Sequence, residues 1–265
     1  MKKAFPAALA GLLFLTGCCG LFQSKETRYK KAMECAFRIT DERSIEILKK
    51  GMYCCEALPP EIRTLPEARR FYLDKALELK PEDPVALDSV ARSYWDEGSY
   101  GKGLEYFGRV RKVSTSPMSA VIGEVTMLRL LGEWDKAGPD LQWIRAQKGV
   151  DGEKIADYLE GRLLYDQGKL KEAEPLFKKA IERAAAGDDY LGRTPYTMRD
   201  AHFYLAQIKL KAGDPQGAYE EFKVFLRQMS NPDFQIFYAY WLPILGKDQT
   251  AFYEKIEGDW LHVRQ

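Results

Sequence analysis

The chain has 265 residues, of which 46% are hydrophobic and 30% are charged, a composition that fits one large domain or an extended repeat array. Lysine and arginine number 40 against 39 aspartates and glutamates, so no excess of cations points to nucleic acid, whose phosphates need clustered positive charge. The two histidines, His202 and His262, lie far apart in the sequence, which argues against a histidine-rich metal site.

The first residues have the pattern of a secretory signal. Lys2 and Lys3 precede an apolar run over residues 4–15. This run is too short to cross a bilayer as a helix, which takes about 20 apolar residues. Small residues and then Cys18 follow in the segment 15–18, LTGC.

This segment resembles the signal peptide and lipobox of bacterial lipoproteins. The resemblance implies a signal peptide over residues 1–17, acylation of Cys18 and a lipid-anchored tether over residues 18–25. The covalent lipid is the only non-protein group we expect, with no metal and no other cofactor. Cys19 stands where an aspartate would retain such a protein at the inner membrane, which favours the outer membrane, facing the periplasm. The alternative is an ordinary secreted protein with a chance cysteine.

The other cysteines allow a disulfide, since the periplasm is oxidising. We expect one bridge at most, from Cys35 to Cys54 or Cys55, linking two neighbouring helices. The alternative is that these cysteines are small buried apolar residues. No CxxC spacing or nearby histidine suggests a zinc site.

Two apolar stripes at helical spacing predict helices near the start of the mature chain. The first consists of Tyr29, Met33 and Phe37, and the second of Ile45, Leu48, Met52 and Cys55. Ala57 fits the first helix of a degenerate repeat. The segment 64–67, TLPE, reads as a capping box that begins the second helix of that repeat.

A repeat dominates the rest of the chain. Four glycines mark it at separations of 34, 36 and 45 residues: Gly98, Gly132, Gly168 and Gly213. Seven residues before each glycine stands a small or medium-sized residue: Ala91, Val125, Gly161 or Ala206. Five residues after each glycine stands a small residue: Gly103, Ala137, Ala173 or Ala218. Nine residues after each glycine stands a large apolar residue: Phe107, Leu141, Phe177 or Phe222. The position four residues before each glycine is apolar in three repeats, and Lys209 is the exception in the fourth.

Each part of this pattern has a physical role. Glycine ends a helix because it adopts positive φ freely, small residues let two helices approach, and the large residue fills the groove toward the next unit. The pattern resembles the tetratricopeptide repeat, a helix–turn–helix unit of 34 residues. This resemblance implies an all-α solenoid of helical hairpins in a right-handed superhelix. Clear repeats fall at about 84–117, 118–151, 154–187 and 199–232, with degenerate units at 26–83 and 233–265.

Prolines support this frame. The pairs Asp83-Pro84, Ser116-Pro117 and Asp214-Pro215 each predict an N-cap side chain before a proline at the first helical position. Pro139 and Pro175 recur seven residues after a glycine, which places them near the first turn of a second helix.

In proteins of this repeat family, the first helices of successive repeats line a concave groove where partners bind. Arginines there could hold carboxylates of an extended peptide, and aromatic rings could supply contact area. The carried-over positions are Asp88, Arg92, Trp95, Ile122, Thr126, Arg129, Tyr158, Arg162, Tyr165, Phe203, Gln207 and Leu210. The alternative is that Trp95 and Tyr165 pack as core and that the arginines are solvated.

Two further segments stand outside this scheme. Residues 187–198 interrupt the repeat period and could be a binding loop or a tolerated insertion. The aromatic segment 234–241 could be an association surface or could seal the end of the array.

No pattern of catalytic residues occurs. The segment 98–103, GSYGKG, lacks the spacing of a phosphate loop, and no nucleophile or base is nominated. We therefore expect a non-enzymatic, membrane-anchored scaffold that binds a protein or peptide in the cell envelope, in assembly of a pilus, a secretion system or the outer membrane. The alternatives are a self-associating envelope spacer and an accessory subunit of an envelope enzyme. The oligomeric state stays open.

Overall fold

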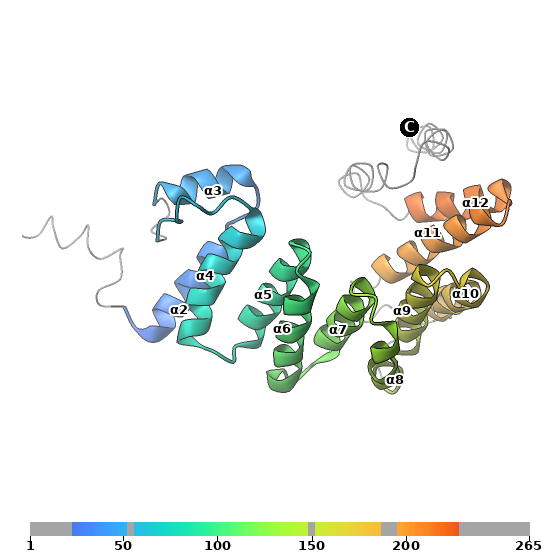
Figure 1. The fold of residues 1–265 in the computed structure, drawn as a ribbon, viewed down its shortest axis with the longest axis horizontal. Coiled ribbons are helices and arrows are strands. Elements are labelled where there is room, and N and C mark those ends of the chain that lie inside the picture. Colours follow the sequence, from blue (N-terminus) through green and yellow to red (C-terminus); the bar gives the residue numbers. More distant parts are fainter. Residues whose placement is uncertain (1–22, 52–55, 148–151, 187–194, 228–265) are drawn as a thin grey trace, which may run out of the picture. The chain divides into compact units, whose positions relative to one another are not determined.

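The computed structural model describes residues 23–51, 56–147, 152–186 and 195–227 (Figure 1). All regular structure in these ranges is helical, as the repeat pattern predicted. The helices are α2 (Lys25–Phe37), α3 (Glu42–Lys49), α4 (Leu65–Leu79), α5 (Pro84–Asp96), α6 (Tyr100–Val113), α7 (Met118–Leu130), the 3-10 helix η2 (Trp134–Ala137), α8 (Gly138–Arg145), α9 (Gly152–Asp166), α10 (Leu170–Ala186), α11 (Pro195–Lys211) and α12 (Pro215–Arg227). Cys18 and the segment 234–241 lie outside the described residues.

The chain forms two compact units, Met1–Ala137 and Gly138–Gln265. In unit 1, α2 pairs with α4 and α5 pairs with α6, while α5 packs on α4 and α7 packs on α6. In unit 2, α9 pairs with α10 and α11 pairs with α12, while α8 packs on α9 and α11 packs on α10. The boundary falls inside the predicted repeat 118–151. Each unit is thus a stack of helical hairpins, and a superhelix through both stays a prediction.

All four repeat glycines end a helix with positive φ. The angles are 80° at Gly98, 73° at Gly132, 75° at Gly168 and 79° at Gly213. After each glycine, the next N–H donates back to the carbonyl five residues earlier, for example from Ser99 to Tyr94 at 2.8 Å. This closes a Schellman turn, in which a left-handed residue satisfies carbonyls that the helix leaves open.

The predicted caps are present in three of four cases. Asp83 Oδ1 accepts from the N–H of Ala86 at 2.9 Å, and Asp214 Oδ1 accepts from the N–H of Gly217 at 2.8 Å. At α4, Thr64 and Glu67 form the reciprocal capping box. These side chains satisfy N–H groups that the first turn of a helix leaves unpaired.

The cap predicted at Ser116 is wrong. Pro117 itself is the N-cap of α7, without a side-chain cap hydrogen bond. The backbone N–H of Ser116 instead donates to Ser114 Oγ at 3.2 Å. The first helical turn therefore begins one residue later than the Ser-Pro pair predicted.

The degenerate N-terminal unit also differs from prediction. The helix predicted from the second apolar stripe is α3, which ends at Lys49 and is followed by Gly51 with a φ of 68°. Ala57 lies outside any helix, just before Pro59 and Pro60, which disfavour helix at the residues before them. The hairpin partner of α4 is α2 rather than a helix through Ala57.

Pro175 is not in the first turn of its helix either. It lies inside α10, which begins at Leu170, whereas Pro139 is the second residue of α8 as expected. The difference arises because the 3-10 helix η2 occupies the start of the second helix in the repeat 118–151.

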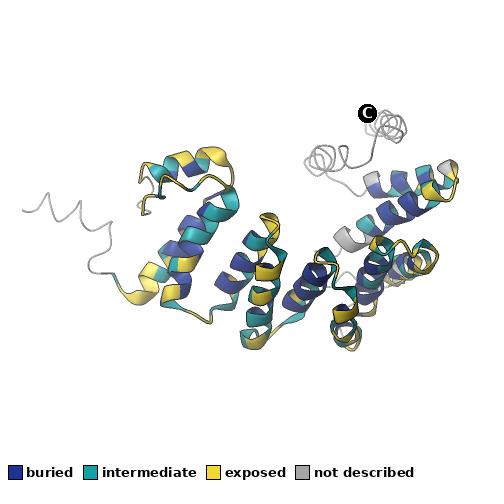
Figure 2. Cartoon of the chain, viewed as in Figure 1, coloured by how far each residue is buried: buried dark blue, intermediate teal, exposed yellow. Residues whose placement is uncertain are grey.

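Close contacts at glycines hold the hairpins together. A Cβ on Gly123 of α7 would lie 2.7 Å from the Phe107 ring of α6, and a Cβ on Gly161 of α9 would lie 3.1 Å from the Phe177 ring of α10. Both rings are almost fully buried, and Figure 2 shows buried residues on the helix sides that face their neighbours. The missing side chains let the aromatic rings reach the opposite backbone.

An ion pair recurs where one repeat meets the next. Arg111 Nη1 lies 2.9 Å from Glu124 Oε2, and Arg145 Nη2 lies 2.8 Å from Glu160 Oε2. Each arginine follows its repeat glycine by 13 residues, and each glutamate precedes the next repeat glycine by eight. Aligning the chain on the glycines could have revealed this pair, which the sequence analysis missed.

We predict that Gly123→Ala destabilises the protein by about 1–3 kcal/mol, because its methyl group overlaps the buried Phe107 ring. Urea unfolding followed by circular dichroism measures the change. The matched control is Gly101→Ala on α6, where no atom lies within 4 Å of the added Cβ. It should be neutral or stabilising by up to about 1 kcal/mol. Equal effects of the two substitutions would contradict this packing.

Candidate functional site

In unit 2, the first helices of two successive repeats, α9 and α11, bring together an arginine and several tyrosines. The guanidinium of Arg162 on α9 lies 5.0 Å from the ring centre of Tyr204 on α11 and 5.8 Å from that of Tyr158 on α9. Arg162 Nη1 donates to the Tyr158 hydroxyl at 3.4 Å, and this hydroxyl donates to Asp200 Oδ2 at 3.3 Å. Cation–π contact and hydrogen bonding thus fix the guanidinium between the two helices.

A lysine extends this group along α11. Lys211 Nζ donates to the Tyr165 hydroxyl at 3.1 Å and lies 4.6 Å from the centre of the same ring. The Tyr165 ring meets the Tyr204 ring edge to face at 5.1 Å. We refer to these residues together as the α9–α11 cluster, which comprises Tyr158, Arg162, Tyr165, Asp200, Tyr204 and Lys211.

Arg162 is incompletely partnered inside this cluster. Its Nε is buried and donates to no acceptor among the described residues. Burial alone would lower the pKa of Arg162, but Tyr158, Tyr204 and the carboxylates of Asp200 and Asp166 outweigh burial and raise it. Burial raises the pKa of Tyr158 well above its usual range. The cluster therefore presents a permanent cation beside neutral phenols, a setting suited to an anionic or carbonyl group.

The first helix of the repeat 84–117, α5, carries an exposed stripe of side chains. Arg92 Nε lies 2.7 Å from Asp88 Oδ2, and Arg92 Nη2 donates to Ser119 Oγ on α7 at 3.2 Å. Val85 and Trp95 flank this pair and are 55% and 37% exposed. The α5 stripe, defined as Val85, Asp88, Arg92 and Trp95, follows one helical face at spacings of three and four residues. Trp95 is therefore not a core residue.

The other predicted positions on α7 contribute less surface. Thr126 is buried, and its hydroxyl donates to the Ile122 carbonyl at 2.8 Å. Ile122 and Arg129 are partly exposed. Of the three predicted positions on this helix, only Ile122 and Arg129 thus offer surface to a partner.

On α11 the residues that meet α9 differ from the predicted set. Phe203 is buried and packs on Phe222 and Phe225 of α12, with ring centres 5.9 and 5.5 Å apart. Gln207 is also buried, and Leu210 is partly exposed. The side chains that reach α9 are instead Asp200, Tyr204 and Lys211. Their spacing of four and seven residues marks one helical face, which is the signal that could have found them.

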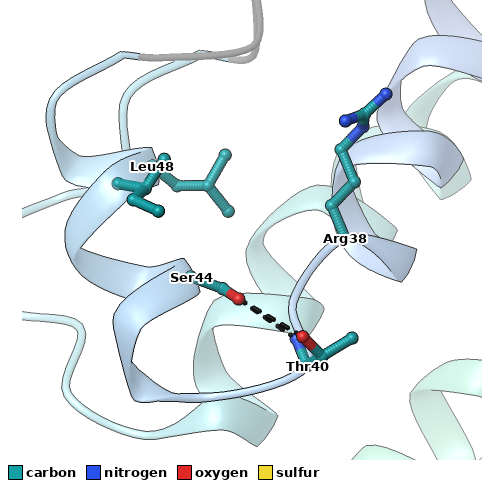
Figure 3. A pocket seen from close by; sticks show the side chains of 5 residues that line it. Arg38, Thr40, Ser44 and Leu48 are labelled. Atoms are coloured by element: carbon teal, nitrogen blue, oxygen red, sulfur yellow. Dashed lines mark hydrogen bonds between the residues drawn. The ribbon is translucent and has the colours of Figure 1, made fainter.

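A small polar pocket lies between the end of α2 and α3 (Figure 3). Its volume is about 230 Å³, and it is lined by Arg38, Thr40, Ser44, Ile47 and Leu48. The Ser44 hydroxyl donates to the N-cap residue Asp41 at 2.8 Å and lies 3.4 Å from the Thr40 hydroxyl. These hydroxyls serve the turn that starts α3, so the pocket does not nominate a ligand.

Cys35 is buried in α2 and forms a disulfide. All other cysteines of the chain lie outside the described residues, so the choice between Cys54 and Cys55 as partner stays a prediction. Within the described ranges, no group of three or more histidine, cysteine, aspartate or glutamate side chains could hold a metal ion. None of the helices there is both long and apolar enough to cross a membrane.

The hairpins and their glycine turns have a counterpart among known families. Residues 128–189 and 158–231 match the tetratricopeptide repeat. This matched region includes α9, α10 and α11, and hence the whole α9–α11 cluster. No curated protein sequence matches the chain.

Several solved structures are similar in fold alone. The fragment of MamA from residue 41 to its end, from Desulfovibrio magneticus RS-1, is 18% identical, with 72% of this chain and 96% of that chain covered and a TM-score of 0.45. A thermophilic TPR protein in Thermus thermophilus is 20% identical, with coverages of 67% and 91% and a TM-score of 0.47. YrrB, described as a TPR protein with an unusual peptide-binding site, is 19% identical, with coverages of 77% and 93% and a TM-score of 0.40.

The two arginines should differ in their effect on stability. Arg162→Ala should destabilise the protein by about 2 kcal/mol, because the guanidinium packs between two tyrosine rings. Arg92→Ala should change stability by no more than about 0.5 kcal/mol, because half of its side chain is exposed and its ion pair is a surface pair within one helix. Urea unfolding checks both, and a larger loss at Arg92 would contradict the geometry.

Proposed function

We propose that the protein is a membrane-anchored scaffold of helical hairpins that binds a protein or peptide partner in the cell envelope. The proposed setting is the assembly of a surface structure such as a pilus, a secretion system or the outer membrane. The observation that carries the proposal is the α9–α11 cluster, where an arginine with an unpartnered buried Nε is held among tyrosines.

The composition of this cluster supports binding. Arginine and tyrosine are among the residues that most often dominate the energy of protein interfaces. Because these side chains lie on helices rather than loops, they are held in place before a partner arrives, which lowers the entropy lost on binding. Tyr165 and Lys211 lie at the open side of the cluster, since Tyr165 is partly exposed and Lys211 is exposed.

The charges indicate what the partner offers. Arg162 Nε is a buried donor without an acceptor among the described residues, and Lys211 Nζ donates to the Tyr165 hydroxyl rather than to a carboxylate. Arg92 on the α5 stripe is half exposed. We infer an extended segment with a carboxylate, either an acidic side chain or a chain end, and with an apolar side chain that packs on an aromatic ring such as Tyr165.

The anchoring part of the proposal rests on the N-terminal sequence. The lipobox-like segment 15–18 supports acylation of Cys18 and release of residues 1–17. The disulfide at Cys35 supports an oxidising compartment such as the periplasm, because cytosolic disulfides are rare.

Partner capture tests the binding proposal. The tagged mature chain and two variants, Arg92→Ala/Trp95→Ala and Tyr165→Ala/Lys211→Ala, serve as baits in envelope extracts of the native cells. Quantitative mass spectrometry compares the recovered proteins. At least one partner should drop about tenfold with a variant, since each hot-spot side chain contributes on the order of 1–2 kcal/mol.

The matched control for this capture is Lys171→Ala/Lys179→Ala, which removes two exposed cations from α10 and should leave recovery unchanged. All baits are first checked by circular dichroism for wild-type helix content. Equal recovery of every partner by wild type and both binding-surface variants would sink the assigned surface.

Metabolic labelling tests the anchor. Cells fed a radioactive fatty acid should label the wild-type chain, while Cys18→Ser should abolish the label and release the protein from the membrane fraction. Cys19→Ser is the control and should retain both. A labelled Cys18→Ser variant, or a wild-type chain without label, would contradict acylation at Cys18.

A further inference from the structure

One edge of unit 1 gathers the first turn of α2 and the last turns of α4 and α6 (Figure 1). Lys80 Nζ at the end of α4 lies 2.8 Å from Glu26 Oε2 in the first turn of α2. Arg109 Nη2 near the end of α6 donates to the Pro81 carbonyl in the turn after α4 at 3.2 Å. These two contacts place the three helix ends side by side, at the end of unit 1 where the N-terminal chain enters.

This edge is rich in cations. We name it the tether edge and define it by six basic side chains: Lys25, Arg28, Lys30, Lys80, Arg109 and Lys112. Lys25, Arg28, Lys30 and Lys112 are exposed, and none of these four forms an ion pair with a described residue. Four positive charges are therefore available for an external anion.

The carboxylates at this edge do not cancel these charges. Glu26 is paired with Lys80, whose hydrogen bond lowers the pKa of Glu26. Asp83 caps α5 through the N–H of Ala86 and accepts a hydrogen bond from Tyr29. Glu78 in the last turn of α4 and Glu82 in the turn that follows are exposed acids, so the six basic side chains of the edge face four acidic ones: Glu26, Glu78, Glu82 and Asp83. The tether edge therefore carries net positive charge.

We propose that the tether edge docks on the anionic phospholipid headgroups of the membrane and so sets the orientation of unit 1. The inference rests on the proposed acyl anchor at Cys18. Lys25 lies seven residue steps after Cys18, and at most about 3.6 Å per step limits their separation to roughly 25 Å. The edge is therefore always close to the bilayer and can reach it.

The short tether favours the membrane surface over other anionic partners. A polybasic surface next to a lipid anchor is attracted by anionic lipids over about one Debye length, roughly 8 Å at physiological salt. A diffusing acidic protein would have to compete with a headgroup layer that the anchor already holds nearby at high effective concentration. The lipid surface is thus the occupant that charge and chain length select.

Lysine labelling measures this docking. The acylated mature chain is reconstituted in vesicles of phosphatidylcholine alone or with one third phosphatidylglycerol. Acetylation rates by an amine-reactive ester are read by peptide mass spectrometry. Lys25, Lys30 and Lys112 should react about tenfold more slowly on the anionic vesicles, and high salt should remove this protection.

The controls lie on α10. Lys171 and Lys179 are exposed there and should react equally on both vesicles. The variant Lys25→Glu/Lys30→Glu should remove the protection of Lys112, whereas Lys171→Glu/Lys179→Glu should leave it unchanged. Equal rates for the tether-edge lysines on the two vesicles would overturn the proposal.

Failure of acylation is visible separately. The mass of the N-terminal peptide reports whether Cys18 carries a lipid. If it does not, a polyhistidine tag in place of residues 1–18 holds the same chain on a nickel-chelating lipid, and the labelling is repeated. Protection there upholds docking without the anchor, and its absence overturns docking. Neither result depends on whether the α9–α11 cluster binds a partner.

Discussion

The stacking of the hairpins depends on close approach at residues that lack a side chain. Gly123 and Gly161 each receive the ring of a buried phenylalanine, Phe107 or Phe177, directly against the backbone. A buried aromatic ring contributes a large apolar area only if the opposing helix comes within contact distance. The glycine and the ring therefore act together, and the neighbouring helix faces are brought into register by this contact.

Polar groups then discriminate between neighbouring registers. The ion pairs Arg111–Glu124 and Arg145–Glu160 repeat the same geometry at successive joints. Asp157 adds a buried carboxylate that holds Arg145 of α8 at 2.5 Å and Arg183 of α10 at 3.2 Å. Because a buried carboxylate is costly without its cations, a shift of either helix along α9 would leave Asp157 uncompensated. Apolar packing supplies the association of the helices, and these pairs specify their alignment.

The sequence was informative where one residue type has one structural use. Positive φ at the four repeat glycines and the caps at Thr64, Asp83 and Asp214 were predictable, because local backbone chemistry determines them. The unit boundary inside the repeat 118–151 was not, because no local pattern marks it.

The candidate site was predictable in kind but not in detail. The resemblance to the repeat family placed Tyr158, Arg162 and Tyr165 on α9, where Arg162 contacts Tyr158, while their binding of a partner stays a prediction. The partner face of α11 was misassigned, because Phe203 and Tyr204 are adjacent and both aromatic. Only packing against α12 decides which ring turns inward.

The Schellman turns have a separate consequence for protein engineering. Because main-chain groups alone form the hydrogen bond that closes each turn, as from Asp214 to the Lys209 carbonyl, the second helix of one hairpin could be exchanged for that of another at this turn without redesigning the linker.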